Sequence, residues 1–285
     1  MDIQKRVAAI HDISGFGKCA LTVALPVISA AGIETSVIPT AVLSTHTGGI
    51  SGFTYRDLTD DMPKIIEHWK SLGLTFNAIY SGYLGSQAQI DIVGQFIDSF
   101  RTENCFALVD PAMADNGKLY TGFTPEFAKH MGTLCAKADI IVPNMTEASF
   151  MLGIDYVEEG VDEAYVEDIL KRLNALGATN VVLTGVSFDK DKIGFALYES
   201  EIDKISYYFN DRIDAKFHGT GDIFSSVCIG GVMRGISLYD SLKLAADYTR
   251  ECIRITMDDK EKHWYGVKFE EAIPYLLKEL EKYTK

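Results

Sequence analysis

The sequence predicts an α/β fold built on a mostly parallel sheet that helices cover on both faces. Short apolar runs of strand length alternate along the chain with longer segments whose apolar residues recur at helical spacing. The short runs are apolar throughout, which is typical of parallel strands buried on both faces. No linker rich in Pro, Gly or Ser, no repeat and no low-complexity run divides the 285 residues, so we expect a single domain spanning 1–285.

The first half of the chain begins with a strand, a loop and a helix. Residues 7–10 form an apolar run that stops at the polar, glycine-containing loop 11–17, and the apolar stretch 19–31 after it has helical length. Gly32 ends this helix before a second strand at 34–42. We expect further strands at 78–81 and 105–109, and helices at 60–72, 87–100 and 125–135.

The second half continues the alternation and closes with helices. We expect strands at 139–142 and 180–184, followed by a meander of two strands at 195–198 and 205–209. The expected helices are a short one after Thr146 and Glu147, which could cap it, and those at 163–176, 223–231, 238–255 and 269–283.

Several polar residues follow the predicted strands. They are Asp12, Ser14, His46, Thr47, Tyr83, Asp110, Asn144 and Thr184. Open sheets of this kind bind ligands beyond the carboxyl ends of their strands. We therefore expect these side chains to share one rim of the sheet.

The composition limits the partners and the compartment. With 27 Lys and Arg against 40 Asp and Glu, the formal charge is −13, which argues against nucleic acid or an anionic membrane as the main partner. The five cysteines are widely spaced, as expected for reduced core residues, and no CxxC or HExxH motif indicates zinc. Neither a signal peptide nor an apolar segment of membrane length is evident, so we expect a soluble, cytoplasmic protein.

Residues 217–222, Phe-His-Gly-Thr-Gly-Asp, run into an apolar segment of helical length. Gly219 and Gly221 would let the main chain approach a phosphate at a helix N-terminus, which attracts anions. Asp222 stands where a carboxylate could take the proton of an attacking hydroxyl. The pattern favours phosphoryl transfer to an alcohol, although an ordinary loop ending in a helix cap uses the same residue types.

A second motif, Asn144-Met145-Thr146-Glu147, follows a predicted strand and separates an amide from a carboxylate by about one helical turn. The amide could contact a phosphate while Glu147 faces hydrated magnesium, an ion that favours carboxylates and keeps its waters. Asp110, at another strand end, offers a second carboxylate. A capping arrangement in which Thr146 and Glu147 serve only the helix explains the motif equally well.

Residues 15–20, Gly-Phe-Gly-Lys-Cys-Ala, match the loose dinucleotide fingerprint of NAD-dependent dehydrogenases. That fingerprint expects an acidic residue at the end of the second strand, whereas Glu34 lies at its start and Pro39-Thr40 at its far end. A dehydrogenase is therefore a remote alternative. The Walker pattern of P-loop enzymes is absent.

Taken together, the motifs resemble a known family. His218-Gly219-Thr220-Gly221-Asp222 with Asn144-x-x-Glu147 resembles the signature pair of the ribokinase-like superfamily of ATP-dependent small-molecule kinases. The segments similar to the pyridoxal (vitamin B6) kinases are 44–48, 81–85, 110–115 and 142–144. The motifs occur in family order, from Val7 to about Ile236. The resemblance implies a three-layer α/β/α sandwich with a mostly parallel central sheet and without the separate lid domain of the sugar kinases.

The resemblance also implies how the reaction would be catalysed. Asp222 would be the base that deprotonates the hydroxymethyl group of the substrate, and Gly219, Thr220 and Gly221 would form the anion hole for the transferred phosphoryl group. A monovalent cation, usually potassium, assists many members of the family. The family is typically homodimeric.

Binding roles follow from the same resemblance. The residues expected around the ATP phosphates are Asn144, Glu147 and Thr184, together with Gly219, Thr220 and Gly221. Asp110 and Glu147 are expected to act through Mg²⁺ and its waters. The residues expected near the pyridine ring are His46, Thr47 and Tyr83.

The first loop departs from the pyridoxal kinases. Many of them carry Gln-Ser-His there, with the serine contacting the pyridine ring's polar groups, whereas this chain has His11-Asp12-Ile13 followed by Ser14-Gly15. The Asp-x-Ser-Gly pattern is more similar to the hydroxymethylpyrimidine kinases of thiamine synthesis. An ionised Asp12 only accepts hydrogen bonds, so it could pair with a protonated ring nitrogen or an amino group of the substrate. We expect Asp12 and Ser14 to bind substrate, unless Asp12 is a loop acid that bonds its own backbone.

The sequence thus predicts a kinase that transfers the γ-phosphate of ATP to the hydroxymethyl group of pyridoxal, pyridoxine or pyridoxamine. A kinase of hydroxymethylpyrimidine or its phosphate is the main alternative. A regulator that binds nucleotide or vitamer without catalysis is less expected, because both signature motifs are intact.

Overall fold

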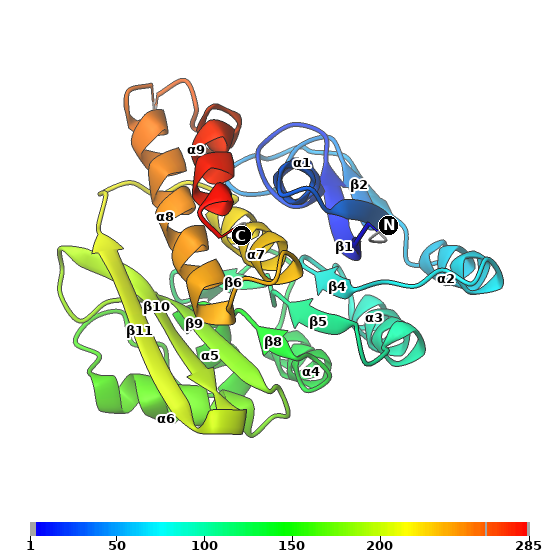
Figure 1. Ribbon diagram of the computed structural model, residues 1–285, viewed down its shortest axis with the longest axis horizontal. Helices are drawn as coiled ribbons and strands as arrows, with labels where there is room; N and C mark the ends of the chain where they lie inside the picture. Colours follow the sequence, from blue (N-terminus) through cyan, green and yellow to red (C-terminus); the bar gives the residue numbers. More distant parts are fainter. Residues whose placement is uncertain (1–3, 260, 284–285) are drawn as a thin grey trace. The chain divides into compact units, whose positions relative to one another are not determined.

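Figure 1 traces the chain of the computed structural model, which describes residues 4–259 and 261–283. The chain forms two compact units. The first unit comprises residues 1–78 and 213–285, and the second comprises residues 79–212. The N-terminal strands and the last helices therefore belong to the same unit.

The strands of the first unit bring two loops together. β1 (Arg6–Ser14) pairs in parallel with β2 (Glu34–Leu43), and β3 (Tyr55–Asp57) pairs antiparallel with the end of β2. Because β1 and β2 are parallel, their carboxyl ends meet, and the Gly15 amide donates a hydrogen bond of 2.8 Å to the Leu43 carbonyl. The loops that follow these two strands are therefore neighbours.

Five helices of the described residues complete the first unit. They are α1 (Leu21–Ala30), α2 (Met62–Ser71), α7 (Thr220–Met233), α8 (Leu238–Met257) and α9 (Phe269–Glu281). α1 packs against β1 and β2, and α2 packs against β2. α7 packs against both α1 and α8, and α9 packs against α8 (Figure 1).

Two glycines allow the close packing of α7. A Cβ atom on Gly230 would lie 2.8 Å from the Cβ of Ala31, and one on Gly231 would lie 2.5 Å from the Oγ of Ser241. No larger residue fits at either position without moving its neighbour. The end of α7 is thus fitted against residues at the ends of α1 and α8.

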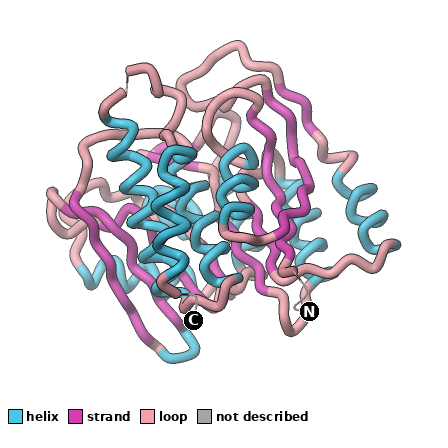
Figure 2. Tube along the Cα trace, turned by 45° about the horizontal axis from the view of Figure 1, so that its top comes forward, coloured by secondary structure: helices cyan, strands magenta, loops and turns pink. Residues whose placement is uncertain are grey.

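The second unit holds a mixed group of strands. In order they are β11 (Lys204–Asp211), β10 (Lys192–Glu199), β9 (Asn180–Val186), β8 (Ile140–Ile141), β5 (Phe106–Val109) and β4 (Ala78–Ser81), of which β4 begins one residue before the unit does. β5, β8 and β9 run parallel, whereas β9, β10 and β11 form an antiparallel meander. In Figure 2, β10 and β11 form a long hairpin whose tip is the single turn η1 (Ser200–Ile202).

Four helices of the second unit begin at side-chain caps. They are α3 (Gln87–Phe100), α4 (Pro125–Cys135), α5 (Met145–Leu152) and α6 (Glu163–Asn174). Their N-caps are Ser86, Thr124, Asn144 and Asp162, and each side chain accepts a hydrogen bond from an amide in the first turn. Such caps satisfy donors that the helix itself leaves unpaired. A short hairpin of β6 (Ala114–Asp115) and β7 (Lys118–Leu119) precedes α4.

The alternation of strands and helices is confirmed, with three differences. β1 continues to Ser14, so residues 11–14 are strand rather than loop. The run 7–14 is buried except for Ile13, which is half-buried, and its polar residues still lie inside the sheet. The short strand β3 and the β6–β7 hairpin carry too few residues for a periodic pattern and were not predicted.

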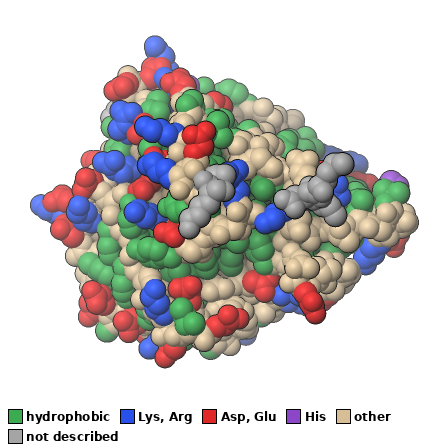
Figure 3. Space-filling view, in the orientation of Figure 1, with side chains coloured by type: hydrophobic (Ala, Val, Ile, Leu, Met, Phe, Trp, Pro, Cys, Tyr) green, Lys and Arg blue, Asp and Glu red, His purple; other side chains and the backbone are tan. Residues whose placement is uncertain are grey.

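The cysteines and the surface agree with the composition. Cys105, Cys135, Cys228 and Cys252 are buried as free thiols, and Cys19 is half-buried. Figure 3 shows acidic and basic side chains intermixed over α8. Among the residues described, no helix combines the length and the apolar character that a membrane span requires.

Candidate active site

The Gly-Thr-Gly-Asp motif forms the N-terminus of α7 in the first unit. Gly219 is the N-cap, with φ of 80°, and no side chain caps the helix. A Cβ atom on Gly219 would lie 1.8 Å from the Lys18 carbonyl oxygen, so only glycine fits between the two loops. The Thr220 hydroxyl donates to the Phe217 carbonyl at 3.4 Å rather than capping α7. The motif therefore differs from an ordinary capped helix start, and Asp222 lies half-buried in the first turn.

Asp12 and Asp222 both lie near Cys19, although they are far apart in sequence. Both carboxylates act on the thiol of Cys19 and help burial to raise its pKa, so the three side chains share one neighbourhood. The Ser14 hydroxyl donates to Asp12 Oδ2 at 3.0 Å. Asp12 is 5% exposed, and burial raises its pKa to about 6 against the opposing effect of the Ser14 hydrogen bond. Asp12 and Ser14 thus form a buried polar pair near the mouth of α7.

Replacing Asp12 by asparagine is expected to stabilise the protein at pH 8 but not at pH 4. The folded pKa of about 6 lies above the ordinary value of 3.8, so folding disfavours the ionised form. Native stability therefore falls as pH rises from about 4 to about 6, by about 2 to 3 kcal/mol. Urea unfolding of Asp12→Asn at both pH values measures this difference. The exposed Asp60→Asn serves as control, and an equal effect of Asp12→Asn at both pH values would contradict the assignment.

His46 lies in the loop that follows β2, beside the loop that follows β1. Its backbone amide donates to the Phe16 carbonyl at 2.9 Å, and its Nδ1 accepts from the Gly48 amide at 3.1 Å. A Cβ atom on Gly17 would lie 2.0 Å from its Cδ2, so the imidazole rests directly on the first loop. Burial and the neighbouring His218 lower the pKa of His46, with the Tyr265 backbone acting in the opposite direction. His46 is therefore a neutral imidazole, and its proton is on Nε2 because Nδ1 accepts a hydrogen bond. Thr47, the next residue, is exposed.

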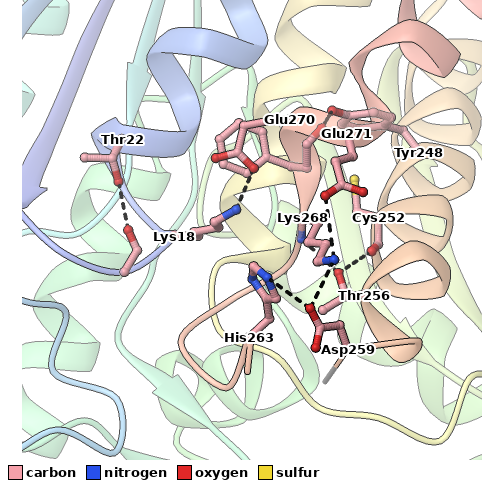
Figure 4. Close-up of polar contacts among 12 residues, drawn as sticks. Lys18, Thr22, Tyr248, Cys252, Thr256, Asp259, His263, Lys268, Glu270 and Glu271 are labelled. Atoms are coloured by element: carbon pink, nitrogen blue, oxygen red, sulfur yellow. Dashed lines mark hydrogen bonds and ion pairs between the residues drawn. The ribbon is translucent and has the colours of Figure 1, made fainter. Parts of the chain in front are cut away.

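The loop between α8 and α9 covers the first loop. The Lys18 amide donates to the Tyr265 carbonyl at 3.2 Å, and the rings of Phe16 and Tyr265 lie 4.7 Å apart. Lys18 Nζ also binds Glu270 at 2.6 Å, as Figure 4 shows. Lys18 is thus held by an ion pair with α9 rather than free in its loop.

Lys268 anchors the same covering loop. Its ammonium lies 3.4 Å from Asp259 and 3.6 Å from Glu271, and its amide donates to Thr256 Oγ1 at 2.8 Å (Figure 4). Residues 258–263 lie between α8 and α9 in the sequence. Of these, Lys260 lies outside the described residues, while Asp259 joins an ion pair and a network.

In the second unit, Asn144 and Glu147 form a reciprocal cap on α5. Asn144 Oδ1 accepts from the Glu147 amide and Glu147 Oε2 accepts from the Asn144 amide, both at 2.9 Å. Glu147 Oε1 accepts from the Met113 amide at 3.1 Å, and Asn144 Nδ2 donates to the Ala114 carbonyl at 2.9 Å. Thr146 takes no part in the cap. Both members of the motif thus also fix the turn that follows Asp110.

Asp110 and Glu147 form a pair of buried carboxyl groups in this unit, with exposures of 7% and 3%. Burial and then the charge of Asp110 raise the pKa of Glu147 well above 4.5, against hydrogen bonds from the backbone of residues 113, 114 and 144. A cation near the pair would favour the ionised form of both groups. Magnesium suits such a place, because it uses one or two carboxylates together with phosphate oxygens and water. Within the described residues, no group of three or more His, Cys, Asp or Glu side chains could hold a metal alone.

Thr184 and Tyr83 also belong to the second unit. The Thr184 amide donates to the Pro143 carbonyl at 2.9 Å, and a parallel bridge places Thr184 opposite Asn144. The Tyr83 ring lies 5.5 Å from that of Phe123, which stacks on Phe127 at 4.1 Å. The sequence reasoning did not identify the contact between Tyr83 and Phe123, because a lone aromatic residue before a helix carries no motif.

Comparisons with known proteins then place the chain. A family model described as phosphomethylpyrimidine kinase matches residues 24–266. The chain belongs to the phosphomethylpyrimidine kinase family. It is an ATP-dependent small-molecule kinase of the ribokinase-like superfamily, and the α/β fold expected from the resemblance is confirmed.

Solved structures of this kinase family are similar over nearly the whole chain. A Bacteroides thetaiotaomicron protein, provisionally named a phosphomethylpyrimidine kinase, is 39% identical, with a TM-score of 0.92 over 96% of this chain and 94% of that one. The pyridoxal kinase of Lactobacillus plantarum is 29% identical, with a TM-score of 0.88 over 100% of both chains.

Curated relatives are more distant in sequence. The pyridoxal kinase of Dictyostelium discoideum is 24% identical over 70% of this chain and 71% of its own. The pyridoxine/pyridoxal/pyridoxamine kinase of Bordetella avium is 24% identical over 88% of this chain and 85% of its own. The relatives of this kinase thus carry names from both of the substrate classes expected from the sequence.

Proposed function

We propose that this kinase transfers the γ-phosphoryl group of ATP to the hydroxymethyl group of a B6 vitamer. The observation that carries the proposal is the half-buried Asp222 in the first turn of α7, in the same unit as the Asp12–Ser14 pair and the His46 loop. Another crystal form of the Bacteroides thetaiotaomicron neighbour, 39% identical to this chain, contains pyridoxal. The names of the curated relatives support the same substrates.

In the proposed reaction, the substrate hydroxyl loses its proton to Asp222 as its oxygen attacks the γ-phosphorus and the bond to ADP breaks. Backbone amides at Gly219, Thr220 and Gly221 hold the transferred group, helped by the positive end of α7. Thr184, Asn144 and Glu147 contact the ATP phosphates, directly or through bound ions.

Magnesium at Asp110 and Glu147 would neutralise phosphate charge when bound. The two carboxyl groups are buried and repel each other, so a divalent cation would stabilise their ionised forms. Both oxygens of Glu147 already accept backbone hydrogen bonds, so Glu147 would contact a hydrated cation through its water molecules. The proposal also includes a monovalent cation and a homodimer, which rest on the family resemblance, and a cytoplasmic location, which rests on the five cysteines being unpaired.

The vitamer ring would lie against the buried loops of the first unit. Asp12 and Ser14 offer an acceptor and a hydroxyl to the ring's polar groups, and His46 and Thr47 follow β2 beside them. The proposal also assigns Tyr83 of the second unit to the ring, as the family resemblance implies; its own ring lies 5.5 Å from that of Phe123, tilted by 33°.

A hydroxymethylpyrimidine kinase is the second candidate, and the buried Asp12 is compatible with it. A carboxylate next to Ser14 suits the amino group of an aminopyrimidine as well as that of pyridoxamine. The description of the matching family model points the same way.

A coupled ADP-release assay distinguishes the candidates. We expect ADP release with pyridoxal, pyridoxine or pyridoxamine, at a kcat/KM at least about tenfold above that with hydroxymethylpyrimidine, as expected for a site shaped to one ring. A preference for the pyrimidine would establish the second candidate. Absence of acceptor-dependent ADP release with all four compounds would overturn both.

A further inference from the structure

His218 lies between two loops of the first unit that the proposed function uses. It directly precedes Gly219, the N-cap of α7. Its ring lies flat over Gly48, because a Cβ atom there would be 2.4 Å from Cε1, 2.6 Å from Nδ1 and 2.9 Å from Nε2 of the imidazole. The ring centroids of His46 and His218 are 5.0 Å apart. One exposed imidazole thus packs against both the backbone and the buried side chain of the loop at 44–49.

The contact continues through His46 to the first loop. His46 is 4% exposed, rests on Gly17 on one side and faces His218 on another. Its Nδ1 holds the Gly48 amide, which is the residue that His218 covers. Gly17 and Gly48 have no side chains, and the rings of His46 and His218 occupy the space beside them. The loop that follows β1, the loop that follows β2 and the loop before α7 are therefore packed together through these two rings.

We infer that His218 is a positioning residue that holds the acceptor-binding loop 44–49 against the phosphoryl-binding loop 219–221. This inference rests on the proposed function and assigns to His218 the alignment of the acceptor with Asp222. Packing of a flat ring supplies the contact, because His218 covers Gly48 with three ring atoms and faces the ring of His46. The acceptor site would loosen without it, while the residues assigned to the ATP phosphates in the second unit would keep their contacts.

Substitutions at His218 test the role of the ring. His218→Ala is expected to raise KM for the acceptor about 5- to 10-fold, the effect of losing one aromatic contact, with KM for ATP unchanged and kcat within about threefold. His218→Phe keeps a flat ring and is expected to stay within about twofold of the parent protein. Failure of His218→Phe to restore the acceptor KM would overturn a packing role.

Gly48 provides a double-mutant cycle. Gly48→Ala adds a methyl group where the His218 ring lies and should raise the acceptor KM as His218→Ala does. In the His218→Ala background the clash is gone, so Gly48→Ala should add less than about twofold. Gly132→Ala, whose added Cβ would lie 3.7 Å from Leu176 Cδ1, is the matched control. Additive effects of the two substitutions would refute this packing.

Hydrogen exchange separates this inference from the proposed function. The peptide covering 44–54 should exchange faster in His218→Ala and stay as protected in His218→Phe as in the parent protein, whatever the substrate. Unchanged exchange in His218→Ala would overturn the inference even if the parent protein phosphorylates a vitamer. A parent protein without vitamer-dependent ADP release, but with the exchange result intact, would overturn the proposed function and the acceptor role while leaving the loop contact standing.

Discussion

Asp222→Asn is expected to lower kcat by about 10²- to 10⁴-fold, the contribution typical of a positioned general base. The substitution keeps the size of the side chain in the first turn of α7 but removes its ability to accept the substrate proton. Since Gly219 and the α7 backbone remain, binding of ATP should change little. Steady-state kinetics with the preferred vitamer and calorimetric titration with ATP measure the two quantities.

Asp98→Asn is the control for that experiment. Asp98 is an exposed carboxylate of the second unit that pairs with Lys137, and its replacement should leave kcat unchanged. A kcat of Asp222→Asn within about tenfold of the parent protein would show that another group removes the proton. Loss of ATP binding together with kcat would instead assign Asp222 a role in holding the nucleotide.

Glu147→Ala is expected to lower both stability and activity. It leaves the amides of Asn144 and Met113 without their carboxylate partner in a buried place, which costs about 2 to 4 kcal/mol of unfolding free energy. Activity should fall at least about a hundredfold, because the proposed Mg²⁺ position loses one of its two carboxylates. Urea unfolding and the ADP-release assay measure the two effects.

Magnesium should act on the parent protein through the same carboxyl group. Because folding raises the pKa of Glu147, its ionisation weakens the native state as pH rises above the ordinary value of 4.5. A cation at the pair would reverse this penalty, so MgCl₂ added with ADP should raise the unfolding temperature of the parent protein and of exposed Glu103→Ala, but not of Glu147→Ala. An equal rise in all three proteins would place the metal elsewhere.

The sequence located much of the candidate site because its chemistry is concentrated at strand ends. Asp12 and Ser14 end β1, His46 and Thr47 follow β2, and Asn144 lies opposite Thr184. Apolar runs and polar breaks are local signals, so they identify strands and the residues after them. The arrangement of the chain as one domain, and the roles of these residues, stay predictions.

Features that depend on contacts between distant segments were not predicted. His218 was seen only as part of the Gly-Thr-Gly-Asp motif, since nothing near it in sequence indicates that its ring would cover Gly48. The cap of α5 was assigned to Thr146 and Glu147, whereas Asn144 is the cap and Thr146 accepts from the Gly117 amide. That choice depends on the β6–β7 hairpin, which brings Gly117 to the helix.

The close packing at Gly230 and Gly231 also bears on the position of Asp222. These residues lie about 12 Å along α7 from Asp222, and a single unbroken helix joins the two places. Alanine at both positions, a common substitution for raising thermal stability, would crowd Ala31 and Ser241. α7 would then have to shift, and the proposed base Asp222 in its first turn would shift with it. We expect such a variant to lose activity although every residue assigned to ligand binding is retained.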